Sequence, residues 1–304
     1  MKNTGNKKIY QEIESLKKEH DAVVIAHNYQ IGEVQEASDF VGDSLGLSIE
    51  ASRREEQVIV FCGVHFMAET AAILAPEKTV IIPEPKAGCP MADMITADQM
   101  RRWKAEHPGA VAVCYVNSTA DVKAECDICC TSSNAVAVVE AVEGETILFA
   151  PDKNLASWVS RHTFKKIIPW EGCCYVHDQI HLQDVLKKKQ EHPDAEVWVH
   201  PECPPAVIDT ADKVLSTGGM VREAGRTASP AVIIGTESGM IYRLEKENSA
   251  VKFFPARDQA ICVNMKKNNL TKLHRALKNS GPVVKVPGDI AARARQAIQK
   301  MIAV

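Results

Sequence analysis

The stretch "AHNYQIGEVQEASDFVGDSLG" at residues 26–46 decides the fold, because the chain contains related copies of it. The copies are "HNYQIGEVQEASDFVGDS" from His27, "YVNSTADVKAECDICCTS" from Tyr115 and "HPECPPAVIDTADKVLST" from His200, and they align without a gap. Each has an aspartate twelve residues after its start and a hydroxyl residue five further on. The starts lie 88 and 85 residues apart, which indicates three domain-sized repeats.

The same register continues beyond these copies. The apolar runs "VIVFC", "TILFA" and "AVIIG" are each followed by a helical segment and then by "TVIIP", "KKIIP" or "VKFFP". This alternation predicts βαβ units and a parallel sheet covered by helices. We therefore predict an α/β protein of three pseudo-threefold-related domains, each a small parallel sheet with helices packed on it, that meet at a central active site. A solenoid is the competing arrangement, but units of about 86 residues are whole domains rather than solenoid turns.

The repeats set the predicted domain boundaries at 1–107, 108–193 and 194–304. After the third repeat, "PVVKV" predicts an added strand and "IAARARQAIQKMI" predicts a closing helix, and we assign both to the third domain.

The composition is that of an ordinary soluble protein, with 45% hydrophobic and 25% charged residues. The net charge of −3 provides no basic field, so we expect neither nucleic acid nor a membrane as a partner. The chain has no apolar run of spanning length and no signal-peptide pattern, so we expect a cytoplasmic location. It also lacks the glycine pattern of dinucleotide-binding folds, the P-loop and the hydrolase nucleophile elbow.

Ten cysteines are unusual for a cytoplasmic chain and favour metal or redox chemistry over disulfides. Six have no cysteine at the equivalent position of the other copies, namely Cys62, Cys114, Cys126, Cys129, Cys130 and Cys203. Shortly after the proline that ends the last strand, however, every copy has one: Cys89, then Cys174 (or its neighbour Cys173), then Cys262. If the domains surround an axis, these equivalent loops converge.

Three converging thiolates suit a [4Fe–4S] cluster with one iron left unligated by the protein. Such an iron would act as a Lewis acid on a bound substrate. Two alternatives remain open from the spacing alone. One is a three-cysteine zinc site, which would want a fourth ligand. The other is three thiols that pack at the seam only as small apolar groups.

Polar side chains follow the first strand of each repeat. His27, Tyr115 and His200 end these strands, and Tyr29, Asn117 and Glu202 stand two residues later. Ligands of parallel sheets bind at the carboxyl ends of strands, and alternate residues that leave a strand point the same way. Each repeat is therefore expected to contribute a pair to a common centre equipped for acid–base chemistry. Taken singly, each could instead be a satisfied structural residue.

The hydroxyl residues of the copies, Ser44, Ser132 and Thr217, precede helical segments. Hydroxyls and unpaired N–H groups at a helix start favour bound anions. Singly, each would be an ordinary helix cap. Together they predict a ligand that carries two or more anionic groups.

The motifs "AHNYQ", "GVHFMAE", "YVNST", "TSSNAV", "HPECP", "GTESGM" and "CVNMKKN" together resemble quinolinate synthase, from about residue 20 to 275. The resemblance implies an enzyme of the transferase class in NAD (pyridine nucleotide) biosynthesis. Members of this family condense iminoaspartate (iminosuccinate) with dihydroxyacetone phosphate to quinolinate, releasing phosphate and two waters. They have three pseudo-symmetric α/β domains and one [4Fe–4S] cluster per chain, held by one cysteine of each domain.

Carried onto this sequence, the resemblance implies a metal site at Cys89, Cys174 and Cys262. The Val-His pair that follows in the family pattern favours Cys174 over Cys173. The implied catalytic residues are Tyr29, Tyr115, His200 and Glu202. The implied substrate-binding residues are His27, Ser44, Tyr115, Val116, Asn117, Ser132, His200, Pro201, Glu202 and Thr217. Some relatives have a second cysteine three residues after the last ligand, whereas this chain has Met265 there.

The partners expected from the resemblance are the two small-molecule substrates. Transient coupling to an aspartate oxidase would fit an unstable iminoaspartate, although no residue of the chain indicates it. An alternative activity is a [4Fe–4S]-dependent hydro-lyase on a small hydroxy acid. An iron or oxygen sensor is a third hypothesis, and it has no DNA-binding helix pair or basic stripe to support it.

Overall fold

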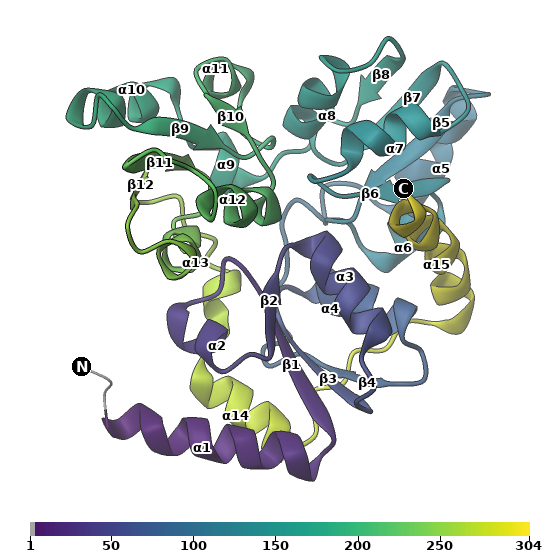
Figure 1. Cartoon of the computed structure of the whole chain (residues 1–304). Helices are drawn as coiled ribbons and strands as arrows, with labels where there is room; N and C mark the ends of the chain where they lie inside the picture. The colour runs from purple at the N-terminus through teal and green to yellow at the C-terminus, as the bar shows by residue number, and fades with distance from the viewer. Residues whose placement is uncertain (1–3) are drawn as a thin grey trace.

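The computed structural model describes residues 4–304 and has the predicted α/β architecture, with three parallel four-stranded sheets (Figure 1). The first sheet contains β1 (Ala22–His27), β2 (Phe40–Gly42), β3 (Val58–Cys62) and β4 (Thr79–Ile81). The second contains β5 (Val111–Tyr115), β6 (Ile128–Cys130), β7 (Thr146–Ala150) and β8 (Lys166–Pro169). The third contains β9 (Glu196–Val199), β10 (Lys213–Val214), β11 (Ala231–Gly235) and β12 (Lys252–Pro255). Each sheet has the order second, first, third, fourth strand, which confirms the repeat.

Helices pack around each sheet (Figure 1). The first repeat has α1 (Thr4–Glu19), α2 (Gly32–Glu36), α3 (Ser44–Arg53), α4 (His65–Leu74) and α5 (Ala97–Glu106). The second has α6 (Ala120–Ala124), α7 (Ala135–Ala141), α8 (Lys153–Ser160), α9 (Tyr175–Asp178) and α10 (Leu182–Glu191). The third has α11 (Pro205–Ile208), α12 (Thr217–Ala224) and α13 (Met240–Glu247). A 3-10 turn, η1 (Met265–Lys267), then leads to α14 (Leu270–Lys278) and α15 (Gly288–Ala303).

The central strands are apolar and buried. Every residue of β1 is buried, as is all but the first residue of β3, β5, β7, β9 and β11. Strands covered by helices on both faces read as continuous runs of valine, isoleucine and leucine, as these do. The apolar runs found in the sequence are therefore the cores of the three sheets.

The aspartate that recurs in every copy has a structural role inside its own sheet. Its Oδ2 accepts the backbone N–H of a residue in the first strand at 2.7–2.8 Å, and its own N–H donates to that residue's carbonyl at 2.8–3.0 Å. The pairs are Asp39 with Val24, Asp127 with Ala112, and Asp212 with Val197. This paired contact, here called the aspartate clasp, fixes where the second strand joins the first.

The C-terminal segment crosses back over the first two repeats. Helix α14 packs against α1 and β3, and α15 packs against α6 and β6. In place of the expected added strand, Val283 makes a single antiparallel bridge to Ile81, the last residue of β4. The flanking Pro282 and Pro287 lack N–H groups, which leaves few residues that could extend the pairing.

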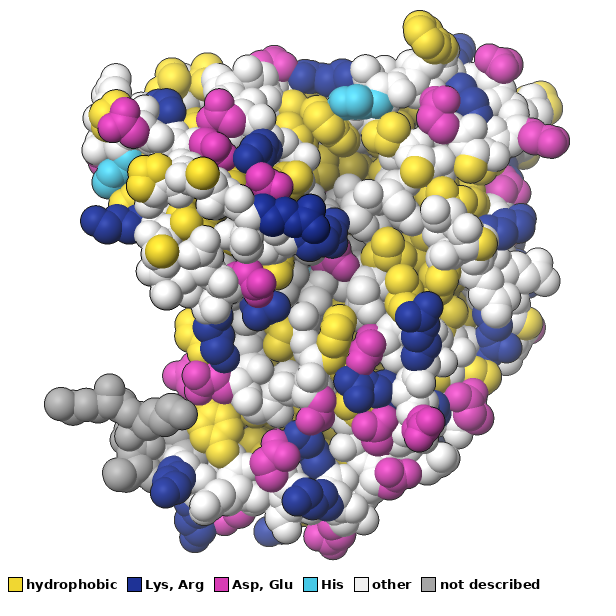
Figure 2. All heavy atoms as spheres, in the orientation of Figure 1, with side chains coloured by type: hydrophobic (Ala, Val, Ile, Leu, Met, Phe, Trp, Pro, Cys, Tyr) yellow, Lys and Arg dark blue, Asp and Glu magenta, His cyan; other side chains and the backbone are white. Residues whose placement is uncertain are grey.

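On the face shown in Figure 2, basic and acidic side chains are interspersed and neither sign forms a continuous patch. Within residues 4–304, no helix combines the length and the apolar character needed to cross a membrane.

Candidate active site

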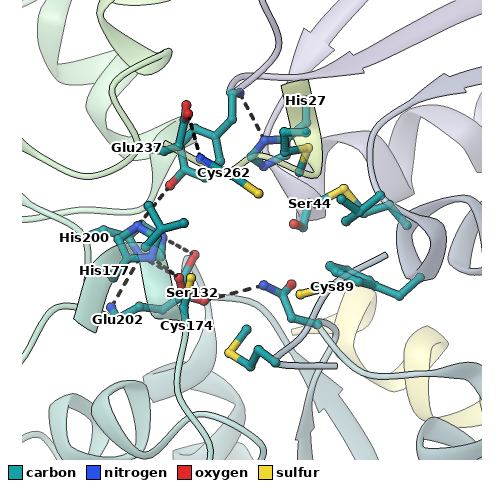
Figure 3. Close-up of a pocket in the computed structure, with 18 of the residues that line it drawn as sticks. His27, Ser44, Cys89, Ser132, Cys174, His177, His200, Glu202, Glu237 and Cys262 are labelled. Carbon is teal, nitrogen blue, oxygen red and sulfur yellow. Dashed lines mark hydrogen bonds and ion pairs between the residues drawn. The ribbon is translucent and has the colours of Figure 1, made fainter. Parts of the chain in front are cut away.

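The three repeats meet around one cavity, and each of them contributes side chains to its lining. Most of the residues predicted from the sequence line it, and Figure 3 shows ten of the lining side chains labelled. The predicted residues that line it are His27, Tyr29, Ser44, Cys89, Tyr115, Asn117, Ser132, Cys174, His200, Glu202, Thr217 and Cys262.

Val116 and Pro201 do not line this cavity. Each stands between two residues that do, and successive residues at the end of a strand point to opposite sides. Val116 is fully buried and instead faces a small space between α3, α4 and β3. Their side chains therefore lie outside the cavity lining, and their part in substrate binding stays a prediction.

The two strand-end histidines have the same hydrogen-bond arrangement. The backbone N–H of Tyr29 donates to His27 Nδ1 at 3.2 Å, and that of Glu202 donates to His200 Nδ1 at 3.3 Å. Burial lowers the pKa of both rings to about 3, so both are neutral near pH 7. A neutral ring whose Nδ1 accepts a hydrogen bond carries its proton on Nε2. Each histidine therefore offers an Nε2–H donor, and that of His200 lies 3.1 Å from Ser132 Oγ.

Glu202 is the hub of the polar side of the cavity. Its Oε2 lies 2.6 Å from His177 Nδ1, Asn117 Nδ2 donates to its Oε1 at 3.5 Å, and the Tyr115 hydroxyl also donates to it. Burial alone would raise the pKa of Glu202, but the imidazoles of His177 and His200 outweigh it and bring the pKa to about 2. The site thus holds a buried, ionised carboxylate.

Tyr29 connects to this hub through His177. The Tyr29 hydroxyl lies 2.5 Å from Thr236 Oγ1 and 3.3 Å from His177 Nε2, and Thr236 Oγ1 is 2.8 Å from the same nitrogen. Burial first, and then the charge of Glu202, raises the pKa of Tyr29 well above its usual range. Hydrogen bonds therefore join a protonated phenol to His177, whose Nδ1 lies 2.6 Å from the Glu202 carboxylate.

The hydroxyl residues lie near helix starts, but not as caps. Ser44 and Thr217 are the first residues of α3 and α12, whose caps are Asp43 and Ser216. Ser132 lies three residues before the start of α7 at Ala135. The expected link to helix termini holds for two of the three repeats, and the third uses a longer loop.

The cysteine loops enter the cavity from three sides (Figure 3). Cys89, Cys174 and Cys262 line it, and no other cysteine of residues 4–304 does. Cys173, the neighbour left open by the sequence, lies outside the lining. Burial raises the pKa of all three cavity thiols, that of Cys89 to about 12.

Each of these sulfurs also accepts a hydrogen bond from the backbone N–H three residues later. The donors are Ala92 for Cys89, His177 for Cys174, and Met265 for Cys262. Backbone N–H groups directed at thiolate sulfurs are a feature of protein iron–sulfur sites, and metal binding displaces the thiol protons. The donor set, three soft sulfur ligands with N–H support and no fourth cysteine, fits a [4Fe–4S] group with an open iron.

A second set of ligand atoms lies within the same cavity. One atom each of Cys174, His177 and Glu202 lie within 4.8 Å of one another. Mixed sulfur, nitrogen and oxygen ligands of this kind also suit a single zinc ion. His177 Nδ1 lies 2.6 Å from Glu202 Oε2 but forms no hydrogen bond of accepted geometry, so these two groups leave a single-metal site open.

Several residues of the site were not predicted from the sequence, among them His177 and Glu237 in the cavity lining and Thr236, which contacts Tyr29. In the sequence analysis, His177 was used only as part of the Val-His pair that favours Cys174 over Cys173. Glu237 had a detectable signal, because its equivalents in the register are Asp152 and Val64, so two of three copies carry an acid. Thr236 carries no such signal.

These acids hold the cysteine loops. Asp152 Oδ2 accepts the backbone N–H of Cys174 at 3.0 Å, and Glu237 Oε1 accepts that of Cys262 at 3.1 Å. Lys266 Nζ pairs with Glu237 at 2.9 Å and also donates to the carbonyl of Tyr29. The loops that carry two of the thiols are thus fixed to the ends of β7 and β11.

Comparison with known proteins agrees with this geometry. The family model described as "Quinolinate synthetase A protein" matches residues 11–303. A quinolinate synthase of Dehalococcoides mccartyi (strain ATCC BAA-2266 / KCTC 15142 / 195) is 56% identical over 296 residues, covering 97% of this chain and 98% of the relative. One of Methanoregula boonei is 52% identical over 295 residues, with 97% and 98% covered. One of Thermodesulfovibrio yellowstonii is 53% identical over 293 residues, with 96% and 97% covered.

These relatives cover nearly the whole chain at more than half identity, and they do not favour the hydro-lyase alternative. The chain is an enzyme, and it belongs to the quinolinate synthase family.

Proposed function

We propose that the chain condenses iminoaspartate with dihydroxyacetone phosphate to quinolinate, releasing phosphate and two waters. We propose further that Cys89, Cys174 and Cys262 hold one [4Fe–4S] cluster per chain. The observation that supports both is that one thiol from each repeat lines the same cavity as the strand-end histidines and the Glu202 carboxylate. When bound, the cluster supplies a Lewis-acidic iron that polarises an oxygen of the reacting molecule.

The binding role falls to neutral donors and to hydroxyls. His27 and His200 each offer an Nε2–H, and Ser44, Ser132 and Thr217 offer hydroxyls to the same space. Neutral donors can hold two carboxylates and a phosphate without the cost of burying an unpaired cation. In a chain with a net charge of −3, these local dipoles capture the anionic substrates.

The proton-transfer role falls to Glu202 and Tyr29. Formation of a carbon–carbon bond requires the removal of a proton from the triose, and an ionised carboxylate can accept it. Burial keeps the Tyr29 hydroxyl protonated. This hydroxyl can donate a proton to a substrate oxygen, either one that leaves or one that takes part in a tautomerisation. His200 then orients the developing oxyanion by donating its Nε2–H, while the Tyr115 hydroxyl holds the Glu202 carboxylate in place.

The test is an anaerobic assay of quinolinate formation from the two substrates, run beside an assay of simple dehydration of hydroxy acids. We expect quinolinate to form only when both substrates are present, and Cys89→Ala to abolish it. Cys62→Ala is the matched control, because Cys62 is a buried cysteine of the same repeat that does not line the cavity. Full activity of Cys89→Ala, or dehydration of hydroxy acids without quinolinate formation, would rule the proposal out.

A further inference from the structure

Cys174, His177 and Glu202 form a group of ligand atoms in the cavity that differs from the three thiols. One ligand atom of each lies within 4.8 Å of the others, so a single ion could bind all three. Among the described residues, the thiols of Cys89, Cys174 and Cys262 do not form such a group. Figure 3 shows the Cys174, His177 and Glu202 side chains on one side of the cavity and Cys89 on another. The spacing of the three thiols therefore does not suit a single ion, whereas the spacing of this second group does.

Two of these ligands belong to one turn of the chain. Cys174 is the N-cap of α9, and His177 is the third residue of that helix. A spacing of three residues places both side chains on the same face of a helical turn. Glu202 comes from the loop after β9, in the third repeat. The side chains of His177 and Glu202 are only 2% and 3% exposed, so an ion at this place would be buried between the second and third repeats.

One ring nitrogen of His177 is buried without a hydrogen-bond partner. Its Nδ1 lies 2.6 Å from Glu202 Oε2, but this contact does not have the geometry of a hydrogen bond. The other nitrogen, Nε2, lies 2.8 Å from Thr236 Oγ1. When Nε2–H donates to this hydroxyl, Nδ1 carries a lone pair next to an anionic oxygen. A cation bound by both atoms would relieve their repulsion and give the buried nitrogen a partner.

The surrounding contacts hold these ligands in the way that metal sites require. Thr236 Oγ1 binds the nitrogen of His177 that would face away from the ion, and the His177 ring stacks on that of His200 with their centres 4.6 Å apart. Asn117 Nδ2 donates to the other oxygen of Glu202, Oε1, at 3.5 Å. Outer contacts of this kind orient metal-bound histidines and carboxylates. The imidazole and the carboxylate are thus held in place before an ion binds.

The charges and the types of the ligands favour zinc. A Cys174 thiolate and the Glu202 carboxylate cancel the charge of a divalent ion, and His177 is neutral, so no net charge would be buried. Sulfur and nitrogen ligands suit Zn²⁺, whereas Mg²⁺ and Ca²⁺ prefer oxygen ligands alone. We propose that the cluster-free protein binds one Zn²⁺ ion through Cys174, His177 and Glu202, with a fourth position open to water. Binding displaces the thiol proton of Cys174 to solvent.

The zinc site and the cluster exclude each other, and this part of the inference rests on the proposed function. Both require the Cys174 thiolate, so a bound zinc ion leaves the cluster only the thiols of Cys89 and Cys262. The zinc ion also takes up Glu202, the base of the proposed reaction. Zinc that binds first therefore prevents cluster assembly, and an assembled cluster prevents zinc binding.

Zinc binding to the full chain, freed of iron by a chelator under anaerobic conditions, tests the proposal directly. Competition with a chromogenic chelator gives the stoichiometry and affinity, and X-ray absorption at the zinc edge gives the ligands. We expect one zinc per chain, with one sulfur at about 2.3 Å and nitrogen and oxygen ligands at about 2.0–2.2 Å. The absence of zinc binding, or two or three sulfurs around the zinc, would overturn the proposal.

Single variants identify the ligands. Cys174→Ser, His177→Gln and Glu202→Gln should each weaken zinc binding by about 100-fold or more, because the loss of an outer contact alone costs about 10–100-fold. Four control variants should bind zinc like the unchanged protein, namely Cys89→Ala, Cys262→Ala, Cys173→Ala and His162→Gln. Full affinity in His177→Gln would overturn the proposal, and a loss in Cys89→Ala would assign the zinc to the three thiols instead. If a variant does not fold, X-ray absorption of the unchanged protein still decides the proposal.

Cluster reconstitution with iron and sulfide then tests the exclusion. One equivalent of zinc should prevent it in the unchanged protein and in Cys173→Ala, but not in His177→Gln, which keeps all three cavity thiols. Zinc and a full cluster in the same chain would overturn the exclusion. A chain that binds zinc as expected but never assembles a cluster would contradict the proposed function and support the zinc site, so the two failures can be told apart.

Discussion

The aspartates of the three clasps make the same two backbone hydrogen bonds, whereas the side chains that end the first strands are histidine, tyrosine and histidine. Both sets stand at equivalent positions of the repeat. Each aspartate joins two strands of its own sheet by a pair of backbone hydrogen bonds, and Asp39 and Asp127 also pair with Lys17 and Lys104. The strand ends face one shared cavity. The contact inside each sheet is made by the same residue type in all three repeats, whereas the shared cavity receives histidine from two repeats and tyrosine from the other.

The largest effect is expected when a residue that lines the cavity is replaced, and it is an effect on kcat. Glu202→Gln keeps the shape of the side chain but removes the carboxylate that His177 and Tyr115 contact. We expect kcat to fall by about 10²–10³-fold, the usual contribution of a general base. Steady-state kinetics measure this, with the exposed Glu245→Gln of the same repeat as the control. An unchanged kcat would mean that proton removal does not depend on Glu202.

Substitution of an aspartate of the clasps is expected to lower the stability of the protein and not its turnover. Asp39→Ala removes the acceptor for the Val24 N–H and the partner of Lys17. The free energy of unfolding should fall by about 1–3 kcal/mol, as for a lost hydrogen bond to a charged group. Urea unfolding measures the loss, and the exposed Glu55→Ala serves as the control. A large fall in kcat of the folded variant would show that the clasp aspartates affect catalysis as well as stability, which contradicts the separation of their role from that of the cavity residues.

The pH dependence of stability tests the neutral state of the strand-end histidines. His27 has a folded pKa of about 3 against an ordinary value of 6.5, so between these limits the unfolded chain binds more protons than the folded chain. Stability therefore falls as the pH is lowered, by about 2 kcal/mol for this ring between pH 7 and pH 5. In His27→Gln that part of the fall should disappear, while the exposed His162→Gln should follow the unchanged protein. An equal pH dependence in His27→Gln would show that the ring is not buried as a neutral group.

The smallest effect is expected at the anion-binding hydroxyls. Ser132→Ala removes one hydrogen bond from the cavity and leaves His200 Nε2 without its protein partner. We expect KM for one substrate to rise about 2–10-fold with little change in kcat, the value of a single hydrogen bond. Ser133→Ala, in the same loop, should leave KM unchanged. A fall in kcat alone would indicate that Ser132 acts on the transition state and not in binding.

The sequence predicted the three sheets because the copies align without a gap and because buried strands read as apolar runs. It also predicted most of the cavity, since the ends of equivalent strands must meet if the sheets surround an axis. Residues that act singly were harder to find. His177 and Thr236 contact Tyr29 through tertiary packing, and neither recurs at the equivalent position of the other repeats.

The packing partners of the C-terminal segment also could not be predicted from the sequence. The amphipathic pattern of α15 predicts a helix, but nothing in the pattern states that its partners are α6 and β6 of the second repeat. The expected strand after α14 is limited to one bridge by the prolines on either side. Local patterns therefore predicted the elements, while the choice of partner depended on the whole fold.

The most direct test of the central claim is the iron and acid-labile sulfide content of anaerobically isolated protein, in single alanine variants of the three cavity cysteines. We expect about four iron and four sulfide per chain in the unchanged protein and in Cys173→Ala and Cys62→Ala. Cys89→Ala, Cys174→Ala and Cys262→Ala should each lose the cluster while keeping the fold. A full cluster in any of these three variants, or zinc in place of iron in the unchanged protein, would contradict the account.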